Sequence, residues 1–248
     1  MGFATLLYHE IRKRDEFHPE KPYSIDVKQE YEDQLPAPLF ITLDQFEEQM
    51  EFLYRENFHT LTLAEVRDYF YRGKNIPEKS VLITFDDCFQ SMKQYAYPVL
   101  KKYGFHAVAF VVTGWLHDEP KEYNPEKCVC LAKEELDEMA DVFEYANHTD
   151  SFHQRYDVKT GRMMLEKDER FAKDLDECNR HVPVKDVFAY PFGLFHERNV
   201  ELLRKKWFTL AFTTKTGKND RQTDPLLLKR NIIPFTLELE QFQKIVLG

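Results

Sequence analysis

Two adjacent carboxylates close the clearest apolar segment of the sequence. Residues 80–85 (Ser-Val-Leu-Ile-Thr-Phe) predict a buried strand, and Asp86 and Asp87 follow it directly. Neighbouring residues of a strand point to opposite faces, and a buried charge is costly unless it is paired or bound to a cation. The pair therefore predicts a cation or acid–base site. The alternative left open is that one carboxylate caps a helix that begins near Phe89.

Two histidines follow another predicted strand, over residues 142–146. His148 comes just after it, and His153 follows five residues later. Five residues of a helix turn through about 500°, so the two rings would not share a helical face. They converge only if the segment is a loop that leads into a helix. Two ordinary histidines on a polar loop remain the alternative.

Two further strand ends carry weaker signals. Tyr190-Pro191-Phe192-Gly193 follows a strand at 187–190, and its proline and glycine predict a tight turn. Such a turn exposes backbone N–H groups, which can bind an anion, although it can equally be only a turn. His9 follows a strand at 4–8, and a lone histidine is usually structural.

The joint occurrence of these four strand ends favours chemistry. One carboxylate and two imidazoles form a common three-ligand set for a catalytic zinc or a similar ion, with positions left for water. A second carboxylate is then free to act as a base, and a further histidine can protonate a leaving group. A turn N–H can stabilise an oxyanion. These are the parts of metal-assisted amide or ester hydrolysis.

The elements that must position these residues alternate along the chain. Helices are predicted from Thr42 and from Thr62, which begin capping boxes, and over residues 89–102, 133–141, 162–180, 197–206 and 237–247. Further strands are predicted at 107–112, 209–213 and 226–233. Strand followed by helix, repeated six or seven times, indicates a parallel α/β sheet. The length suits a single domain over 1–248, a closed or nearly closed barrel with a long excursion at about 12–38.

Composition excludes several classes of protein. Lys and Arg total 34 against 43 Asp and Glu, a net charge of −9 that disfavours a nucleic-acid partner. No run of about 18 apolar residues predicts a membrane span. Four cysteines without a C-x-x-C pair do not form a disulfide framework. The N-terminus lacks the pattern of a signal peptide, which predicts a cytoplasmic protein unless a leader has been removed. The oligomeric state stays open.

Three motifs together resemble a known family. Thr84-Phe85-Asp86-Asp87, His148-Thr149 with His153, and Tyr190-Pro191-Phe192-Gly193 are similar, in order and spacing, to the motifs of the polysaccharide deacetylases (the NodB-homology group, carbohydrate esterase family 4) across about residues 80–213. The finer resemblance is to the branch of the poly-N-acetylglucosamine deacetylases. That branch has the five-residue histidine gap and is circularly permuted, so that its L-x-H motif, here Leu7-Tyr8-His9, lies near the N-terminus.

The resemblance implies a fold and a set of roles. The fold is a distorted (β/α)7-type barrel with parallel strands. Asp86 is the general base and His9 the general acid. Asp87, His148 and His153 hold a divalent metal, with Zn²⁺ favoured and Co²⁺, Ni²⁺ or Fe²⁺ as alternatives.

The implied activity is removal of acetyl groups from an N-acetylated, or O-acetylated, sugar polymer or oligosaccharide, with release of acetate. The Phe192 N–H would help to form the oxyanion hole. Substrate contacts are expected from Tyr190, Pro191 and Trp115, and further aromatic contacts are considered at Tyr123 and Phe152. Two other functions stay open: a metal-dependent amidase that acts on a small non-sugar amide, and a non-catalytic carbohydrate-binding relative.

Two positions depart from the family pattern. Cys88 stands where glycine is common, and a small buried side chain is the simplest interpretation. Ala189 stands where many members have the arginine that orients the base. Arg230, on a later predicted strand, is a candidate replacement. Without a replacement, the non-catalytic alternative gains weight.

Overall fold

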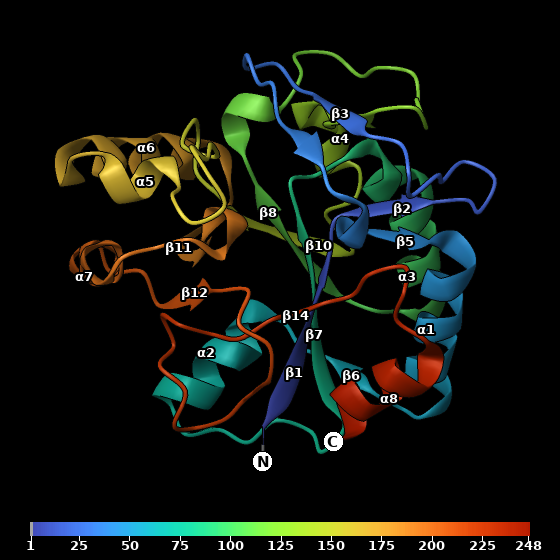
Figure 1. Cartoon of the computed structure of the whole chain (residues 1–248). Coiled ribbons are helices and arrows are strands. Elements are labelled where there is room, and N and C mark those ends of the chain that lie inside the picture. The colour runs from blue at the N-terminus through green and yellow to red at the C-terminus, as the bar shows by residue number, and fades with distance from the viewer. Residues whose placement is uncertain (1) are drawn as a thin grey trace.

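The computed structural model describes residues 2–248, and a nine-stranded sheet forms its centre (Figure 1). The strands of this sheet are β1 (Phe3–Tyr8), β6 (His59–Thr60), β7 (Ser80–Asp86), β8 (Ala107–Val111), β10 (Phe143–Asn147), β11 (Val184–Ala189), β12 (Leu210–Phe212), β13 (Lys218–Asn219) and β14 (Asn231–Ile232). The order along the sheet is β12-β11-β10-β8-β7-β1-β13, while β14 also pairs with β1 and β6 with β7.

The sheet curls into a ring because a late segment joins its two edges. Leu228 bridges Phe212 of β12 in parallel, and β14 pairs in parallel with Leu6 and Leu7 of β1. The ring is thus formed by β1, β7, β8, β10, β11, β12 and the segment that ends in β14, and all its neighbours are parallel. This confirms the predicted (β/α)7-type barrel.

The central strands are apolar because both of their faces are covered, as in other parallel sheets. Every residue of β1, β7 and β8 is buried. Figure 1 shows α1, α3 and α8 along one side of the sheet and α5, α6 and α7 along the other. The α-helices are α1 (Leu43–Arg55), α2 (Leu63–Tyr71), α3 (Tyr97–Tyr103), α4 (Lys133–Asp137), α5 (Arg162–Leu165), α6 (Asp168–His181), α7 (Glu197–Lys205) and α8 (Leu239–Leu247).

Local signals placed most helix ends correctly. Thr62 caps α2 by accepting a hydrogen bond from the Glu65 N–H at 3.2 Å, and Thr42 precedes α1. Gly104, at φ 65°, ends α3 as predicted. A left-handed residue at this position is the usual helix stop, and glycine adopts it without strain.

Two predicted helices were wrong in extent, and a third contains an irregular turn. The helix predicted over 162–180 is two helices, because Glu166 and Lys167 are extended (ψ 155° and 146°) between α5 and α6. The helix predicted over 89–102 is present over residues 90–103, but its residues Met92–Ala96 form the π-helix η2 before α3. The helix predicted over 133–141 ends at Asp137. Helical periodicity does not detect such breaks, because side chains on both sides of the break still face the core.

The excursion predicted at 12–38 is partly regular. It contains β3 (Tyr23–Asp26), β4 (Gln34–Leu35) and most of the short helix η1 (Ala37–Leu39), and it is flanked by β2 (Glu10–Arg12) and β5 (Phe40–Thr42). Strands β4 and β9 (Cys128–Val129) flank β3, and β2 pairs with β5. These short pairings place the excursion beside the barrel mouth. Within residues 2–248, no helix has the length and apolar character of a membrane span.

Candidate active site

The carboxyl end of β7 presents both carboxylates to one cavity. Asp86 is the last residue of the strand, whereas Asp87 has a left-handed backbone (φ 72°) and Cys88 follows it at φ 54°. This turn cancels the alternation that would send neighbouring side chains to opposite faces. The unusual backbone also explains why glycine would suit position 88. Cys88 itself is wholly buried, as predicted for a small structural side chain.

The two histidines converge through a loop rather than a helix. His148 follows β10, Thr149 is left-handed (φ 77°), and the chain turns back so that the centroids of the His148 and His153 rings lie 4.8 Å apart. The five-residue gap is therefore compatible with a shared site. The interpretation of two unrelated loop histidines does not fit this geometry.

Asp87, His148 and His153 form a buried group of three possible metal ligands. Their ligand atoms all lie within 4.8 Å of one another. Asp87 Oδ1 is 3.7 Å from His148 Nε2 and 3.4 Å from His153 Nε2, too far for good hydrogen bonds, and Oδ1 has no hydrogen-bond partner. A buried carboxylate oxygen without a partner is costly. An ion held between the three atoms would offset that cost, so the residues fit a divalent metal.

The pKa shifts of these three residues are compatible with a cation between them. Burial, and then the charge of Asp86, raises the pKa of Asp87 well above its usual value. Burial lowers the pKa of His148 and His153, so both imidazoles are neutral near pH 7. Neutral imidazole is the form that binds metals.

His148 is oriented by the strand that lacks the family arginine. Its Nδ1 lies 2.8 Å from the carbonyl oxygen of Ala189, at the end of β11. A proton on Nδ1 donated to that carbonyl leaves the Nε2 lone pair facing Asp87, which is the usual outer contact of a metal-binding histidine. Position 189 thus contributes through its backbone.

Arg230 takes the place of the absent arginine from a different part of the chain. Its guanidinium donates to both carboxylate oxygens of Asp86, at 2.6 and 2.8 Å, and its Nε donates to the Thr213 carbonyl at 3.0 Å. Both partners are buried. Burial alone would raise the pKa of Asp86, but the charge of Arg230 and other neighbours outweighs it and lowers that pKa to about 2. Asp86 is therefore ionised and fixed in orientation.

His9 faces Asp86 from the end of β1. Its Nε2 lies 3.9 Å from Asp86 Oδ2, and its buried Nδ1 has no hydrogen-bond partner. Burial lowers the pKa of His9 to about 4, although the Asp86 charge acts in the opposite direction. The ring is therefore neutral near pH 7.

The Pro-Phe-Gly segment is a tight turn, the short helix η4 (Pro191–Gly193). Phe192 is left-handed (φ 57°), and its ring centroid lies 4.3 Å from that of His153. Gly193 is also left-handed (φ 69°), and a Cβ there would lie 2.0 Å from Thr214 Oγ1. Only glycine fits this turn, which brings Phe192 to the cavity.

A cavity of about 190 Å³ joins these groups. His9, Asp86, Asp87, His148 and His153 line it, together with Phe192 and Trp115. Among the predicted aromatic contacts, Trp115 packs edge-on against His153, with ring centroids 4.5 Å apart.

The other predicted substrate contacts lie elsewhere. Tyr190 and Pro191 are not among the residues that line the cavity. The Tyr190 ring is buried against Phe195, and its hydroxyl donates to the Leu226 carbonyl at 2.9 Å. Phe152 lies in the same apolar cluster, and the Tyr123 hydroxyl donates to Glu16. Neither Phe152 nor Tyr123 lines the cavity either, so the contact of these four residues with substrate stays a prediction.

The sequence suggested that the 12–38 excursion shapes the groove, but it did not identify the residues that do so. Tyr31 and Asp33 line the cavity together with Arg155, which follows the loop that carries His148 and His153. Arg155 donates to both oxygens of Asp33, at 2.6 and 2.9 Å, and lies over the Phe192 ring. These residues belong to polar, turn-rich segments without periodicity. Only the opposite charges of Asp33 and Arg155 are visible in the sequence, and they do not reveal a pairing across 122 residues.

Comparison with known proteins agrees with this geometry. Curated relatives include the poly-beta-1,6-N-acetyl-D-glucosamine N-deacetylases of Staphylococcus aureus and Staphylococcus epidermidis. The first is 28% identical over 216 residues, covering 84% of this chain and 71% of the relative. The second is 28% identical over 241 residues, covering 92% and 78%.

Solved structures show the same fold. The Streptococcus pyogenes deacetylase PplD, in complex with acetate, has a TM-score of 0.77 at 21% identity, covering 99% of this chain and 98% of that one. IcaB from Ammonifex degensii has a TM-score of 0.74 at 22% identity, covering 100% and 97%. A sequence model of the family described as polysaccharide deacetylase matches residues 73–211, which include the carboxylate pair, both loop histidines and the Pro-Phe-Gly turn. The chain therefore belongs to the polysaccharide deacetylase family.

Proposed function

We propose that this chain is a metal-dependent N-deacetylase that acts on a β-1,6-linked polymer of N-acetylglucosamine and releases acetate. The observation that carries the proposal is the buried Asp87–His148–His153 group beside the Arg230-held carboxylate of Asp86. The curated relatives named for that polymer support the substrate. Zn²⁺ is the metal we favour, because an oxygen and two imidazole nitrogens suit it.

The residues divide the reaction between them. A divalent ion at the three ligands supplies Lewis-acid polarisation of the acetyl carbonyl and a lowered pKa for attacking water. Asp86 accepts a proton as the water oxygen bonds to the carbonyl carbon. Arg230 suits it to this role, because it keeps the carboxylate ionised and fixes its direction. The Phe192 N–H stabilises the developing oxyanion.

His9 handles the leaving nitrogen. When the C–N bond breaks, acetate forms and the sugar amine requires a proton. Burial keeps His9 neutral beforehand. The proton that Asp86 takes from the water can pass to His9, because the imidazole, with a pKa of about 4 against about 2 for Asp86, is the stronger base and its Nε2 lies 3.9 Å from Asp86 Oδ2. Its place in the cavity wall beside Asp86 suits transfer of that proton to the amine.

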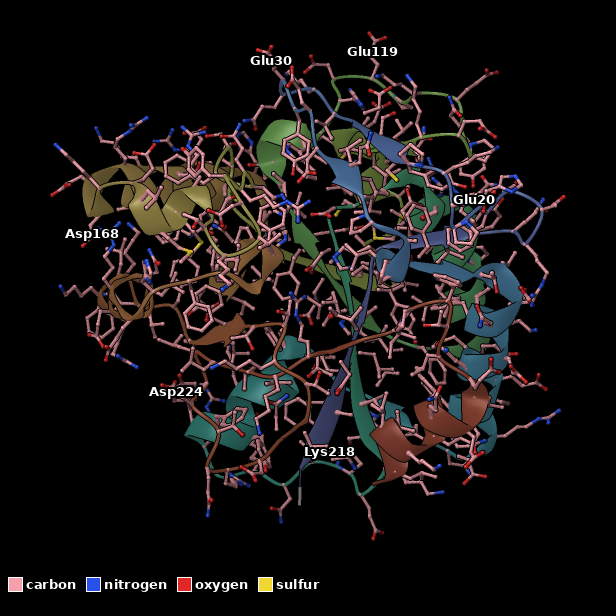
Figure 2. The ribbon with its side chains drawn as sticks, in the orientation of Figure 1. Glu20, Glu30, Glu119, Asp168, Lys218 and Asp224 are labelled. Atoms are coloured by element: carbon pink, nitrogen blue, oxygen red, sulfur yellow. The ribbon has the colours of Figure 1, made fainter. Side chains whose placement is uncertain are left out.

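The surroundings favour a polymer over a small amide. Tyr31, Asp33 and Arg155 also line a wider surface groove of about 650 Å³, together with Glu30 and Tyr156. Figure 2 shows Glu30 at the upper edge of the molecule, directed outward. The catalytic cavity therefore opens beside a groove that offers space for neighbouring sugar residues of the same chain.

The test is acetate release from poly-N-acetylglucosamine by the metal-loaded protein. Asp86→Asn should reduce the rate by about 10²–10⁴-fold, the usual contribution of a general base. Asp186→Asn, which alters a partly exposed carboxylate paired with Arg67, is the matched control. Release by Asp86→Asn within tenfold of the parent would contradict the mechanism.

The same assay separates the alternatives. Faster turnover of cyclic or linear non-sugar amides would identify a small-molecule amidase. Sugar binding without acetate release would identify a binding module.

A further inference from the structure

The loop between the two metal-ligating histidines is held by groups outside the site. Residues 149–152 adopt no helix or strand, and Thr149 is left-handed. Such a segment does not fix the separation of His148 and His153 by its own hydrogen bonds. The positions of both ligands therefore depend on what anchors this loop.

One anchor is the carboxylate of Asp174 on α6. Its Oδ2 accepts the Asp150 N–H at 2.9 Å. Its Oδ1 accepts the Ser151 N–H at 2.8 Å and the Ser151 hydroxyl at 3.0 Å. A single carboxylate thus binds two successive backbone N–H groups midway between the two histidines. In an asparagine, an NH2 group would replace one of these two oxygens and would face an N–H donor, so the same pair of contacts could not form.

The opposite edge of the loop is held from η3 (Thr113–Trp115). The Thr113 N–H donates to the Thr149 carbonyl at 3.2 Å, and the Gly114 N–H donates to the Asp150 carbonyl at 3.0 Å. The Thr113 hydroxyl donates to the Asp150 side chain at 2.7 Å. The loop is therefore clamped between η3 and α6, with Asp174 as the ionisable member of the clamp.

The burial of Asp174 costs more free energy than a purely structural hydrogen-bond acceptor would require. It is 6% exposed, and its hydrogen-bond partners within residues 2–248 are the three uncharged donors of the loop. Burial raises its pKa to about 6, so ionisation at neutral pH costs free energy. It does not line the catalytic cavity. A buried charge without a cationic partner and without access to substrate points to a positioning role.

We propose that Asp174 is a positioning residue that sets the metal affinity of the site by fixing the loop between His148 and His153. This inference rests on the proposed metal site. Outer groups that orient metal ligands typically contribute about 10–100-fold to metal affinity. Loss of the Asp174 contacts should let the loop relax and weaken the binding of both imidazoles together.

The experiment compares the full chain with Asp174→Asn after removal of metal with a chelator. Calorimetric titration with Zn²⁺ should show at least about tenfold weaker binding for Asp174→Asn. The visible spectrum of the Co²⁺-loaded protein should change, because the ligand geometry changes. Asp176→Asn is the matched control on the same helix, where the carboxylate is exposed and pairs with Lys206 at 2.7 Å. It should bind Zn²⁺ within twofold of the parent.

Each outcome bears on the proposal. Lowered thermal stability of metal-free Asp174→Asn, with Zn²⁺ affinity and the Co²⁺ spectrum equal to the parent, would overturn it and show a merely structural role. If Asp174→Asn does not fold, Ser151→Ala replaces it. This variant removes one of the three donors and should weaken Zn²⁺ binding by about threefold, and unchanged affinity would again overturn the inference. A parent chain that binds no Zn²⁺ would refute the proposed function itself.

Discussion

Both ends of the barrel carry histidine–carboxylate pairs, but the two ends are built differently. At the amino ends of the strands, His59 pairs with Glu65 at 2.7 Å and His106 with Glu144 at 2.9 Å. At the carboxyl ends, His148 and His153 lie 3.7 and 3.4 Å from Asp87. The first distances are those of hydrogen bonds, whereas the second leave a gap.

The pairs at the amino end are also more exposed and more fully hydrogen-bonded than the group at the carboxyl end. The His106 and Glu144 side chains are each about a quarter exposed, and Glu144 also accepts the Leu63 N–H at 2.8 Å. The Asp87 side chain is 4% exposed, and its Oδ1 accepts no hydrogen bond. Histidine and carboxylate side chains thus form fully hydrogen-bonded, partly exposed pairs at one end and an incompletely bonded buried group at the other. The missing hydrogen bond of a buried carboxylate, rather than the mere presence of histidine and carboxylate, is therefore the feature that fits the proposed ion.

The largest effect is expected when one of the proposed metal ligands at the carboxyl end of the barrel is removed. His148→Ala should lose stoichiometric Zn²⁺ and reduce acetate release by on the order of 10³-fold or more, because Lewis-acid stabilisation is worth several kcal/mol. Elemental analysis and the acetate assay measure the two effects. Retention of one equivalent of Zn²⁺ together with near-normal activity would refute the ligand assignment.

Removal of the cation beside Asp86 should be the next largest effect. Arg230→Met leaves Asp86 buried and unpaired, which should lower the free energy of unfolding by about 3–5 kcal/mol. Chemical denaturation of the metal-free protein measures it. Asp86→Asn combined with Arg230→Met should recover part of the loss, since no unpaired charge then remains. A loss for Arg230→Met no larger than about 1 kcal/mol would show that the pair is not coupled as described.

A pH effect should follow from the buried imidazole of His9. Its pKa is lowered from 6.5 to about 4, so the native state binds fewer protons than the unfolded state between these values. The free energy of unfolding is therefore unaffected by His9 titration above pH 6.5. It falls by about 3 kcal/mol in total as the pH drops from 6.5 toward 4. Unfolding of metal-free His9→Gln should therefore depend less steeply on pH across this interval. Parallel profiles for variant and parent would contradict the assignment.

The smallest effect is expected at the amino end. His106→Gln should cost no more than about 1 kcal/mol of stability, because the pair is partly exposed and screened by solvent. Zn²⁺ affinity and acetate release should match the parent. A loss of metal affinity in this variant would mean that the two ends of the barrel are not independent.

The sequence was most informative where function depends on neighbours in the chain. The apolar run before Asp86 and Asp87 predicted β7, because a strand buried on both faces must be apolar throughout. The alternation of strands and helices predicted the barrel, and chemistry at the carboxyl ends of strands follows from that fold. The break at Glu166 and the π-helical turn η2 were not visible, because packing rather than periodicity decides where a helix is interrupted or widened.

The site depends partly on residue types that the sequence shows and partly on contacts that only the folded chain makes. Residue types and order indicated a carboxylate, two imidazoles and a turn, and the motif resemblance gave each a role. That Asp87 faces the same cavity as Asp86 required a left-handed backbone at φ 72°, which no local pattern signalled. The sequence named Arg230 as the candidate replacement, but its contact with Asp86, 144 residues away, is decided only when the ring closes.

The amino-acid order by itself thus determined which strands form and which reactive groups end them, because both depend on local polarity and spacing. Tertiary structure alone decided that Arg230 holds Asp86, that Ala189 orients His148 through its carbonyl, and that Asp174 fixes the loop between the histidines. These contacts join segments far apart in the chain. Their geometry depends on how the strands close into a ring and on which buried polar groups must then find partners.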